Sequence, residues 1–427
     1  MTPVLRGSCD EDGRLSVNVG ALRPVAAGLL AVLLTGAAAQ PAVAAPQRAE
    51  QWYLDELRID QAHKLSTGRG VTVAVVDSGV DATHPDIRGQ VLPGGRSYGA
   101  SGDGRADEDG HGTHMAGIIA ATNAATDGVD GIAPDAKILP IKIKKGKGPA
   151  SDQAQAQGIR MAADGGATVI NLSVGGPGAA SPEEEQAIAY ALERDVVVVA
   201  SAGNTAKGES AVISPANIPG VLAVTGTTRG GAFWSGSVRG PEAVVAAPGD
   251  GILNIGPAHG YGWGDGTSDS AAIVSGVAAL VRSKYPDLDA ANVINRIIRT
   301  ARDAGPSGRD TQYGFGRIDP VAALTADVPT VSENPLLDRA APAGGTAQAA
   351  EDDTFDVTKY GDQGGPTDQQ VVVIAAGIGL VLVILLALVI FLIWNRRRRS
   401  READARAGAR DELLDEVSAG GHPQQPR

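Results

Sequence analysis

Short runs of buried-type residues, several of them almost pure valine and isoleucine, recur between helical stretches in the middle of the chain. Five runs are predicted as strands, at residues 71–77, 137–143, 167–173, 196–200 and 221–225. Residues 151–163 and 183–194 have helical patterns, the second with Ser181 as N-cap and Pro182 at the first helical position. Because continuous apolar strands are covered on both faces, the alternation predicts a three-layer α/β fold with a mostly parallel central sheet covered by helices.

Composition limits the partners of this fold. The 427 residues are enough for one large domain with accessory segments. A formal net charge of -12 argues against a nucleic-acid partner, because phosphate binding requires a positive surface. The single cysteine, Cys9, lies in a segment that we expect to be removed. The mature chain therefore has no disulfide, and its hydrophobic core must stabilise it.

The N-terminal segment resembles an export signal. Arg23 precedes an apolar run at residues 25–38 that is too short to span a bilayer, and small residues follow at 42–44. This order of basic, apolar and small residues predicts a signal peptide at residues 1–44. An ordinary buried helix is the alternative, and the small residues at the end of the run favour the signal.

A second apolar segment lies near the C-terminus. Residues 371–394 contain no charge, and four arginines follow at 396–399. A run above about 20 apolar residues spans a bilayer, and the arginines place its C-terminal side in the cytoplasm. The predicted organisation is a signal peptide (1–44), an N-terminal arm (45–70), a folded domain (71–326), a flexible linker (327–370), one C-terminal transmembrane helix (371–394) and a cytoplasmic tail (395–427).

Three short motifs in the folded domain carry reactive side chains. Asp77 stands in an Asp-Ser-Gly triplet at the end of the first predicted strand. His111 opens a small-residue helix, and Ser268 opens an apolar one within Gly-Thr-Ser. An acid, a base and a hydroxyl nucleophile are the parts of a catalytic triad. Each motif alone is weak, since Asp-Ser-Gly is usually a turn, and the prediction depends on all three together.

In this chain order the motifs resemble those of the subtilisin family, over residues 52–320. The resemblance implies a serine endopeptidase that acts on polypeptides through an acyl-enzyme, without a metal or other cofactor. Ser268 would attack the scissile carbonyl, His111 would take its proton, and Asp77 would orient the imidazole. Asn204, which follows a predicted strand within Ala-Gly-Asn, would donate a hydrogen bond to the oxyanion.

The same resemblance implies how a substrate binds. An extended peptide would pair, as an added strand, with the edge formed by Ser173, Val174 and Gly175. The opposing edge would fall near Ala150 and Ser151. Both edges are therefore predicted as the substrate-binding part of the site.

Charged groups near these motifs have two interpretations each. The basic stretch at residues 142–147 is either a solvated strand end or a site where Lys145 or Lys147 selects acidic substrate residues N-terminal to the cut. The acidic loop at residues 103–109 is favoured as a solvated loop over a calcium site, because its spacing is irregular. His114, one helical turn after His111, is expected to be a packed, hydrogen-bonded histidine.

Three features depart from the family pattern. Asp269 follows the predicted nucleophile where the family has an apolar residue, and a carboxylate beside the oxyanion would slow turnover. Ala272 replaces a proline, which could shift Ser268. Residues 45–70 are too short for a folded propeptide. We expect an arm that wraps the domain, so that proteolytic activation is optional.

The layout of signal, arm, protease, linker, single span and basic flank resembles the mycosins, membrane-anchored proteases that accompany type VII secretion systems in actinobacteria. The resemblance implies a single-pass cell-membrane protein with an extracellular catalytic domain, partnered with that secretion complex and acting on its secreted factors. The alternative is a weakly active or inactive scaffold that stabilises a membrane secretion complex. The intact triad and Asn204 argue against a scaffold, whereas the departures at Asp269 and Ala272 are compatible with one.

Overall fold

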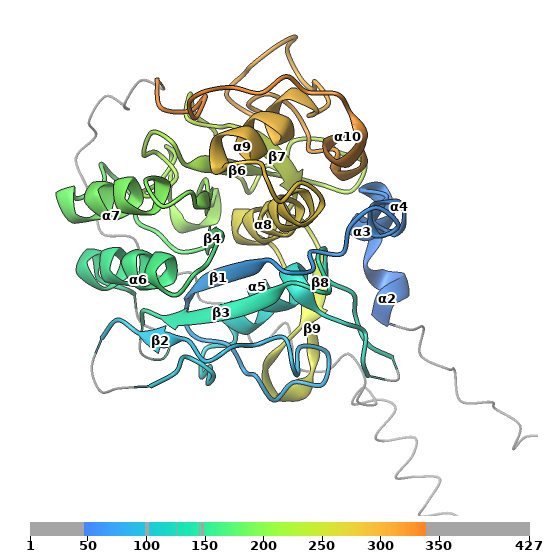
Figure 1. Ribbon diagram of the computed structural model, residues 1–427, viewed down its shortest axis with the longest axis vertical. Helices are drawn as coiled ribbons and strands as arrows, with labels where there is room; N and C mark the ends of the chain where they lie inside the picture. Colours follow the sequence, from blue (N-terminus) through green and yellow to red (C-terminus); the bar gives the residue numbers. More distant parts are fainter. Residues whose placement is uncertain (1–46, 99–101, 126, 145, 147–148, 339–427) are drawn as a thin grey trace, which may run out of the picture. The chain divides into compact units, whose positions relative to one another are not determined.

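The computed structural model describes residues 47–98, 102–125, 127–144, 146 and 149–338 (Figure 1). The predicted signal peptide, the transmembrane segment, the cytoplasmic tail, most of the linker, Lys145 and Lys147 lie outside these residues. None of the helices that are described is both long enough and apolar enough to cross a membrane.

Within the described part of the chain, seven parallel strands form the central sheet in the order β2-β3-β1-β4-β5-β6-β7. The strands are β1 (Thr72–Asp77), β2 (Gly95–Arg96), β3 (Lys137–Lys142), β4 (Val169–Leu172), β5 (Val197–Ser201), β6 (Leu222–Thr227) and β7 (Val245–Pro248). Every residue of β4 to β7 is buried. The predicted parallel sheet is confirmed, and its burial is the physical reason for the continuous apolar runs.

Helices cover this sheet as two pairs (Figure 1). In one pair α6 (Asp152–Asp164) packs against α7 (Pro182–Leu192), and in the other α5 (His111–Ala120) packs against α8 (Thr267–Lys284). The predicted N-cap of α7 is confirmed, because Ser181 and Glu184 cap each other's backbone N–H groups. Further elements after the N-terminal arm are the helices α9 (Ala290–Arg299) and α10 (Pro320–Thr325), the short turns η2 (Thr205–Lys207) and η3 (Pro257–His259), and an antiparallel hairpin of β8 (Ile252–Ile255) and β9 (Tyr261–Gly264).

The N-terminal arm packs against the domain as three short helices, α2 (Gln47–Glu50), α3 (Trp52–Glu56) and α4 (Ile59–His63). Gln51 is fully buried, and its side chain bonds the backbone N–H and C=O of Asp130 at 2.8 Å each. The Trp52 indole N–H donates to the carbonyl of Gly251 at 2.7 Å. This segment therefore contacts two loops that are far apart in sequence.

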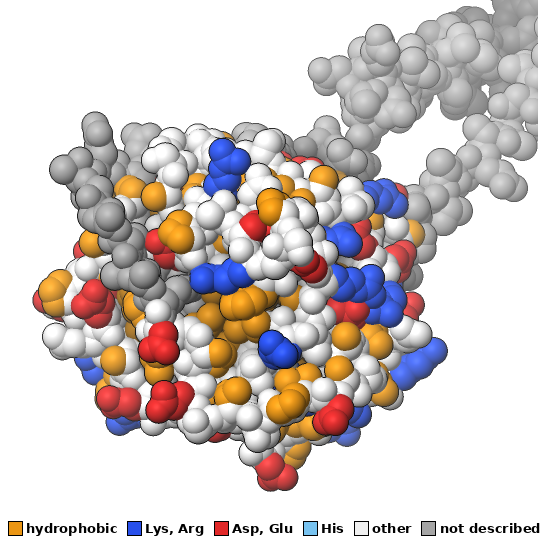
Figure 2. Space-filling view, turned by 90° about the horizontal axis from the view of Figure 1, so that it is seen from above, with side chains coloured by type: hydrophobic (Ala, Val, Ile, Leu, Met, Phe, Trp, Pro, Cys, Tyr) orange, Lys and Arg blue, Asp and Glu red, His pale blue; other side chains and the backbone are white. Residues whose placement is uncertain are grey.

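The surface is mixed in character. On the face shown in Figure 2, hydrophobic side chains gather in a central hollow. Basic and acidic side chains are interspersed around it, which is the usual arrangement of a solvated protein surface.

Candidate active site

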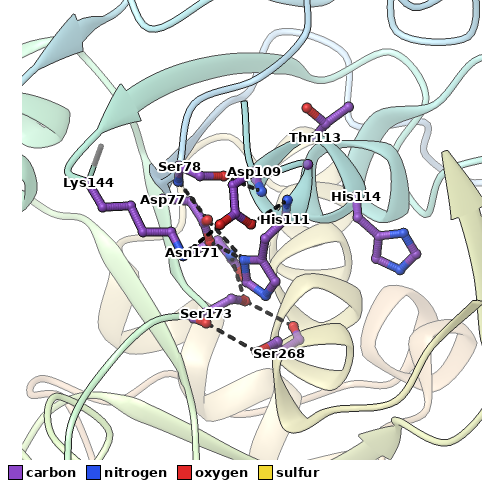
Figure 3. Close-up of polar contacts among 12 residues, drawn as sticks. Asp77, Ser78, Asp109, His111, Thr113, His114, Lys144, Asn171, Ser173 and Ser268 are labelled. Atoms are coloured by element: carbon purple, nitrogen blue, oxygen red, sulfur yellow. Dashed lines mark hydrogen bonds and ion pairs between the residues drawn. The ribbon is translucent and has the colours of Figure 1, made fainter. Parts of the chain in front are cut away.

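The first two predicted site residues meet where β1 ends and α5 begins. Asp77 is the last residue of β1, His111 is the first residue of α5, and both are buried. Nδ1 of His111 lies 2.9 Å from each carboxylate oxygen of Asp77 (Figure 3). Because a carboxylate can only accept, Nδ1 carries the proton and donates it. A neutral His111 ring then presents Nε2 as its basic nitrogen.

Glycines allow this close approach of α5 to the end of β1. A Cβ atom on Gly112 would lie 2.1 Å from the carbonyl oxygen of Gly79, so only glycine fits there. Gly79 itself has a φ of +106°, in the region that side chains avoid. The hydroxyl of Ser78 accepts the Gly112 N–H at 2.9 Å. The small residues of both motifs therefore position Asp77 against His111.

The environment of Asp77 favours its ionised form. Burial opposes a charge at this position, but His111, Lys144 and the Ser78 backbone N–H together hold the pKa of Asp77 below its usual value. The Ser78 N–H donates to Oδ1 of Asp77 at 2.6 Å. The carboxylate is therefore held as a negative acceptor opposite the imidazole.

The acidic loop before α5 caps that helix. Oδ1 of Asp107 accepts the backbone N–H groups of Asp109 and Gly110, at 3.0 and 2.9 Å. Its Oδ2 accepts the backbone N–H and the hydroxyl of Thr113, at 3.0 and 2.7 Å. The expectation of a solvated loop holds for Asp103, which is exposed, and is wrong for Asp109, which is buried. The loop thus fixes the first turn of the helix that carries His111.

Ser268, the predicted nucleophile, is the second residue of α8 and is almost completely buried. Its hydroxyl donates to the carbonyl of Ser173 at 3.1 Å, and the Ser173 hydroxyl donates to the carbonyl of Ser268 at 2.9 Å. Figure 3 shows the His111 ring between Asp77 and the end of α8 that carries Ser268. The three residues of the predicted triad therefore lie near one another at the C-terminal end of β1.

Asn204 follows β5 and is anchored to the start of α8. Its Oδ1 accepts the backbone N–H of Thr267 at 3.0 Å and the Thr267 hydroxyl at 3.2 Å. Because a backbone N–H can only donate, this contact fixes which amide atom faces Thr267, and Nδ2 points the other way as a donor. The Thr267 hydroxyl also contacts the N–H and the C=O of Gly203. Sequence reasoning gave Thr267 no role of its own, although it belongs to the Gly-Thr-Ser motif.

The two predicted substrate-binding edges differ in their surroundings. Ser173 and Val174 are buried, and Gly175 is exposed. Ser173 contacts Ser268 directly, which connects this edge to the predicted nucleophile. At the other edge, the Ser151 hydroxyl caps α6 by accepting the Ala154 N–H at 3.2 Å, and partly exposed Ala150 precedes it.

The basic stretch that follows Ile141 differs from the expected solvated strand end. Lys142 is buried, and its ammonium group pairs with Glu108 and donates to the carbonyl of Ala106. Lys144 is also buried, with its Nζ 3.5 Å from Oδ2 of Asp109. The expectation was wrong for these two lysines, because the acidic loop supplies their partners across space.

The departures at Asp269 and Ala272 are both accommodated by α8. Oδ1 of Asp269 accepts a hydrogen bond from Nε2 of His114 at 2.8 Å, and both side chains are buried. The carboxylate therefore has a hydrogen-bond partner in His114. The expectation that it slows turnover stays a prediction. His114 is packed and hydrogen-bonded as expected. Ala272 is fully buried in a helix that continues from Thr267 to Lys284.

A buried carboxylate–imidazole pair facing a helix-start serine, on a parallel sheet covered by helix pairs, is the architecture of a subtilisin-like serine endopeptidase. The model of the subtilase family, peptidase family S8, matches residues 68–316. The chain belongs to the subtilase family.

Several relatives within this family are mycosins. Mycosin-1 of Mycolicibacterium smegmatis is 36% identical over an alignment of 332 positions, which covers 65% of this chain and 73% of the relative. Subtilisin DY of Bacillus licheniformis is 37% identical over 258 residues, covering 60% of this chain and 91% of the relative. The crystal structure of MycP1 with its N-terminal propeptide removed has a TM-score of 0.60 at 36% identity, covering 66% of this chain and 98% of that one. The chain is thus a subtilisin-like protease that resembles the mycosins.

Proposed function

We propose that the enzyme hydrolyses peptide bonds with Ser268 as nucleophile, His111 as general base and Asp77 as the residue that orients the imidazole. The Ser268 hydroxyl attacks the scissile carbonyl carbon and passes its proton to Nε2 of His111. His111 returns that proton to the leaving amine, which leaves an acyl-enzyme on Ser268. A water molecule, deprotonated by His111, then attacks the acyl-enzyme and releases the carboxylic acid product from Ser268.

The negative oxygen of the tetrahedral intermediate needs hydrogen-bond donors. We assign this role to Nδ2 of Asn204 and the backbone N–H of Ser268. The contact of Asn204 Oδ1 with Thr267 supports the assignment, because it orients the amide before the reaction begins. Loss of an equivalent asparagine costs about 3 kcal/mol of transition-state stabilisation, a magnitude that comes from subtilisin itself.

The substrate backbone would bind as an extended strand along Ser173, Val174 and Gly175, opposite Ala150 and Ser151. Ser173 supports this assignment, since its exchange of hydrogen bonds with Ser268 links the edge to the nucleophile. Main-chain pairing of this kind accepts many side chains, so it fixes the position of the scissile bond more than the sequence of the substrate.

One observation carries the proposal: Nδ1 of His111 lies 2.9 Å from both oxygens of a fully buried Asp77. A fluorophosphonate probe tests it, because the probe reacts only with a serine that a base activates. We expect labelling of the parent and of Ser283→Ala, a change at the far end of α8, and none of Ser268→Ala. Labelling that persists in Ser268→Ala excludes Ser268 as the nucleophile. An unlabelled, folded parent instead indicates the inactive scaffold.

We further propose that residues 371–394 anchor the enzyme in the cell membrane with its catalytic domain outside, where it processes proteins of a type VII secretion system. The resemblance to mycosins supports this, because one related structure, MycP1, is described as an essential component of the type VII (ESX-1) secretion system. The uncharged segment with its arginine flank supports the anchor.

Two measurements test the anchor and the substrates separately. The full chain should fractionate with membranes, and a chain that ends at residue 370 should not. Proteomics of the secreted fraction should show substrates that stay uncut in Ser268→Ala. If secretion needs the protein but no cleavage depends on Ser268, the scaffold function replaces the protease function in this system.

A further inference from the structure

A second buried charge pair lies beside Asp77 and His111. The side chain of Lys144 has 0% exposure and that of Asp109 has 1%, and their charged atoms lie 3.5 Å apart. Lysine and aspartate are almost never fully buried without a partner, because taking a charge out of water is costly. The proposed mechanism uses neither residue, so the position of the pair needs another explanation.

Both members of the pair are joined to the site by short covalent and hydrogen-bonded paths. Asp109 precedes His111 by two residues, and its Oδ1 accepts the backbone N–H of His111 at 3.3 Å. Among the described residues, Oδ2 of Asp109 has no hydrogen-bond donor, and Lys144 is its counter-charge. Lys144 follows β3, where the neighbouring Ile143 N–H donates to the Asp77 carbonyl at 2.8 Å. Figure 3 shows the extended Lys144 side chain reaching toward Asp77 and Asp109.

The surroundings of His111 contain charges of both signs. The charged residues are Asp77 from β1, Asp107 and Asp109 from the loop before α5, and Lys144 from the end of β3. On α8, Ser268 is neutral, and Asp269 is paired with His114. Burial raises the pKa of Asp109, and Lys144 and His111 act against that rise. Lys144 also lowers the pKa of Asp77, with a smaller effect than that of His111. The two pairs are thus coupled electrostatically.

We propose that Lys144 and Asp109 are positioning residues that set the pH range in which His111 works as a base. A proton on His111 is repelled by the Lys144 cation and attracted by the Asp109 carboxylate. Because the groups are buried, salt and water screen these forces weakly. The inference rests on the proposed role of His111 as the general base.

The test is the pH dependence of fluorophosphonate labelling, from about pH 5 to about pH 9, across which an ordinary histidine titrates. The acid limb of this profile is the pH range in which labelling falls because His111 becomes protonated. Lys144→Met removes the charge and keeps the length of the side chain, so the acid limb should move to higher pH by about one unit. Asp109→Asn keeps the shape of the side chain but removes its negative charge, so the acid limb should move to lower pH by a similar amount. The double variant should lie near the parent.

Two controls separate charge from shape. Lys144→Arg retains the cation and should keep the parent profile. Lys137→Met removes a lysine at the other end of β3, where it contacts Gln90, and should also keep it. Opposite shifts in the two single variants support the proposal, since a purely structural role predicts slower labelling with the acid limb of the parent.

Other outcomes overturn the inference. Ser268-dependent labelling with an unmoved acid limb in both single variants, or a shift of both in the same direction, rules it out. If thermal unfolding shows that Lys144→Met does not fold, Asp109→Asn decides alone, and an unmoved limb there is sufficient to reject it. The outcomes above overturn the inference but leave the proposed function intact. A folded parent that is not labelled at any pH would instead contradict the proposed function.

Discussion

Asp269, next to the proposed nucleophile, has a partner in space that its position in the sequence does not reveal. Both ring nitrogens of His114 face acceptors, with Nε2 2.8 Å from Asp269 Oδ1 and Nδ1 3.0 Å from the carbonyl of Ile255. These contacts are satisfied together when both nitrogens carry protons. The Asp269 contact joins the first turn of α8 to α5.

Replacing Asp269 by asparagine is therefore expected to destabilise the fold and not to accelerate the enzyme. The variant replaces the carboxylate acceptor of a buried hydrogen bond with a neutral amide, a change that costs about 1–3 kcal/mol. Urea unfolding compared with Asp287→Asn, an exposed change in the loop after α8, measures that loss. A faster labelling rate above neutral pH with unchanged stability would show instead that Asp269 repels the oxyanion.

Thr267 gives a second prediction at this scale. Thr267→Val keeps the shape of the side chain but removes the hydroxyl that contacts Gly203 and Asn204. We expect the rate of peptide hydrolysis to fall about 5- to 30-fold, equivalent to about 1–2 kcal/mol, because the Asn204 amide is less firmly oriented. Thr267→Ser should retain most of the rate. Equal rates for the valine and serine variants would exclude this role.

The sequence identifies some site residues and hides others for a physical reason. The residues of the proposed site, Asp77, His111, Ser268 and Asn204, stand in short motifs with small neighbours. Close packing requires some of these neighbours, so local patterns suffice to propose the site. Charge partners have no such local signal. Asp269 is 155 residues from His114 in the chain, and only the folded sheet brings them together.

At the scale of elements, the apolar pattern of the sequence determines which strands could be predicted. The five predicted strands are interior strands with continuous apolar runs, and all of them formed in the sheet. β7 is also fully buried, and it was missed because its sequence, Val-Ala-Ala-Pro, contains one β-branched residue and ends in a proline. The β8–β9 hairpin was missed because its turn places Ala258 and His259 in the left-handed conformation, without the usual glycine or asparagine signal.

The N-terminus of α10 provides a pH prediction. Oδ1 of Asp319 caps Ala322 and pairs with Arg58, and Oδ2 pairs with Arg302 at 2.7 Å. Burial opposes the charge, yet the Ala322 N–H and both arginines lower the pKa of Asp319. A carboxylate whose pKa is lower in the folded than in the unfolded state stabilises the protein at pH values above the ordinary aspartate pKa. That contribution is lost as the pH falls through the pKa of the folded state.

Asp319→Asn should therefore reduce the free energy of unfolding by about 1–2 kcal/mol at neutral pH, allowing for the partial exposure of both arginines. The difference from the parent should shrink as the solution is made more acidic than the ordinary aspartate pKa. Urea unfolding at several pH values measures this. A difference that stays constant with pH would assign the effect to lost capping geometry instead of charge.

At the scale of the whole molecule, the N-terminal arm is part of the core. The buried apolar side chains of the arm are Trp52, Tyr53, Leu54, Leu57, Ile59 and Ala62. The Tyr53 hydroxyl accepts the side-chain amides of Gln51 and Asn254, at 2.8 and 3.0 Å. The arm thus connects the β8–β9 hairpin, which leads into α8, to the loop around Asp130. A segment used in this way is a structural element and not a removable inhibitor.

Truncation tests this conclusion. A chain that starts at Gln47 keeps every contact of the arm described above and should unfold at the temperature of the parent. A chain that starts at Lys64 loses the burial of Trp52, Tyr53, Leu54 and Ile59, at about 1.5–3 kcal/mol each. Their sum is comparable to the net stability of about 5–15 kcal/mol of a whole domain, so this chain should not fold alone. Adding residues 47–63 as a peptide should restore labelling of Ser268. If the shorter chain unfolds cooperatively at the parent temperature and is labelled without the peptide, the arm is dispensable, and the conclusion that it is a structural element is wrong.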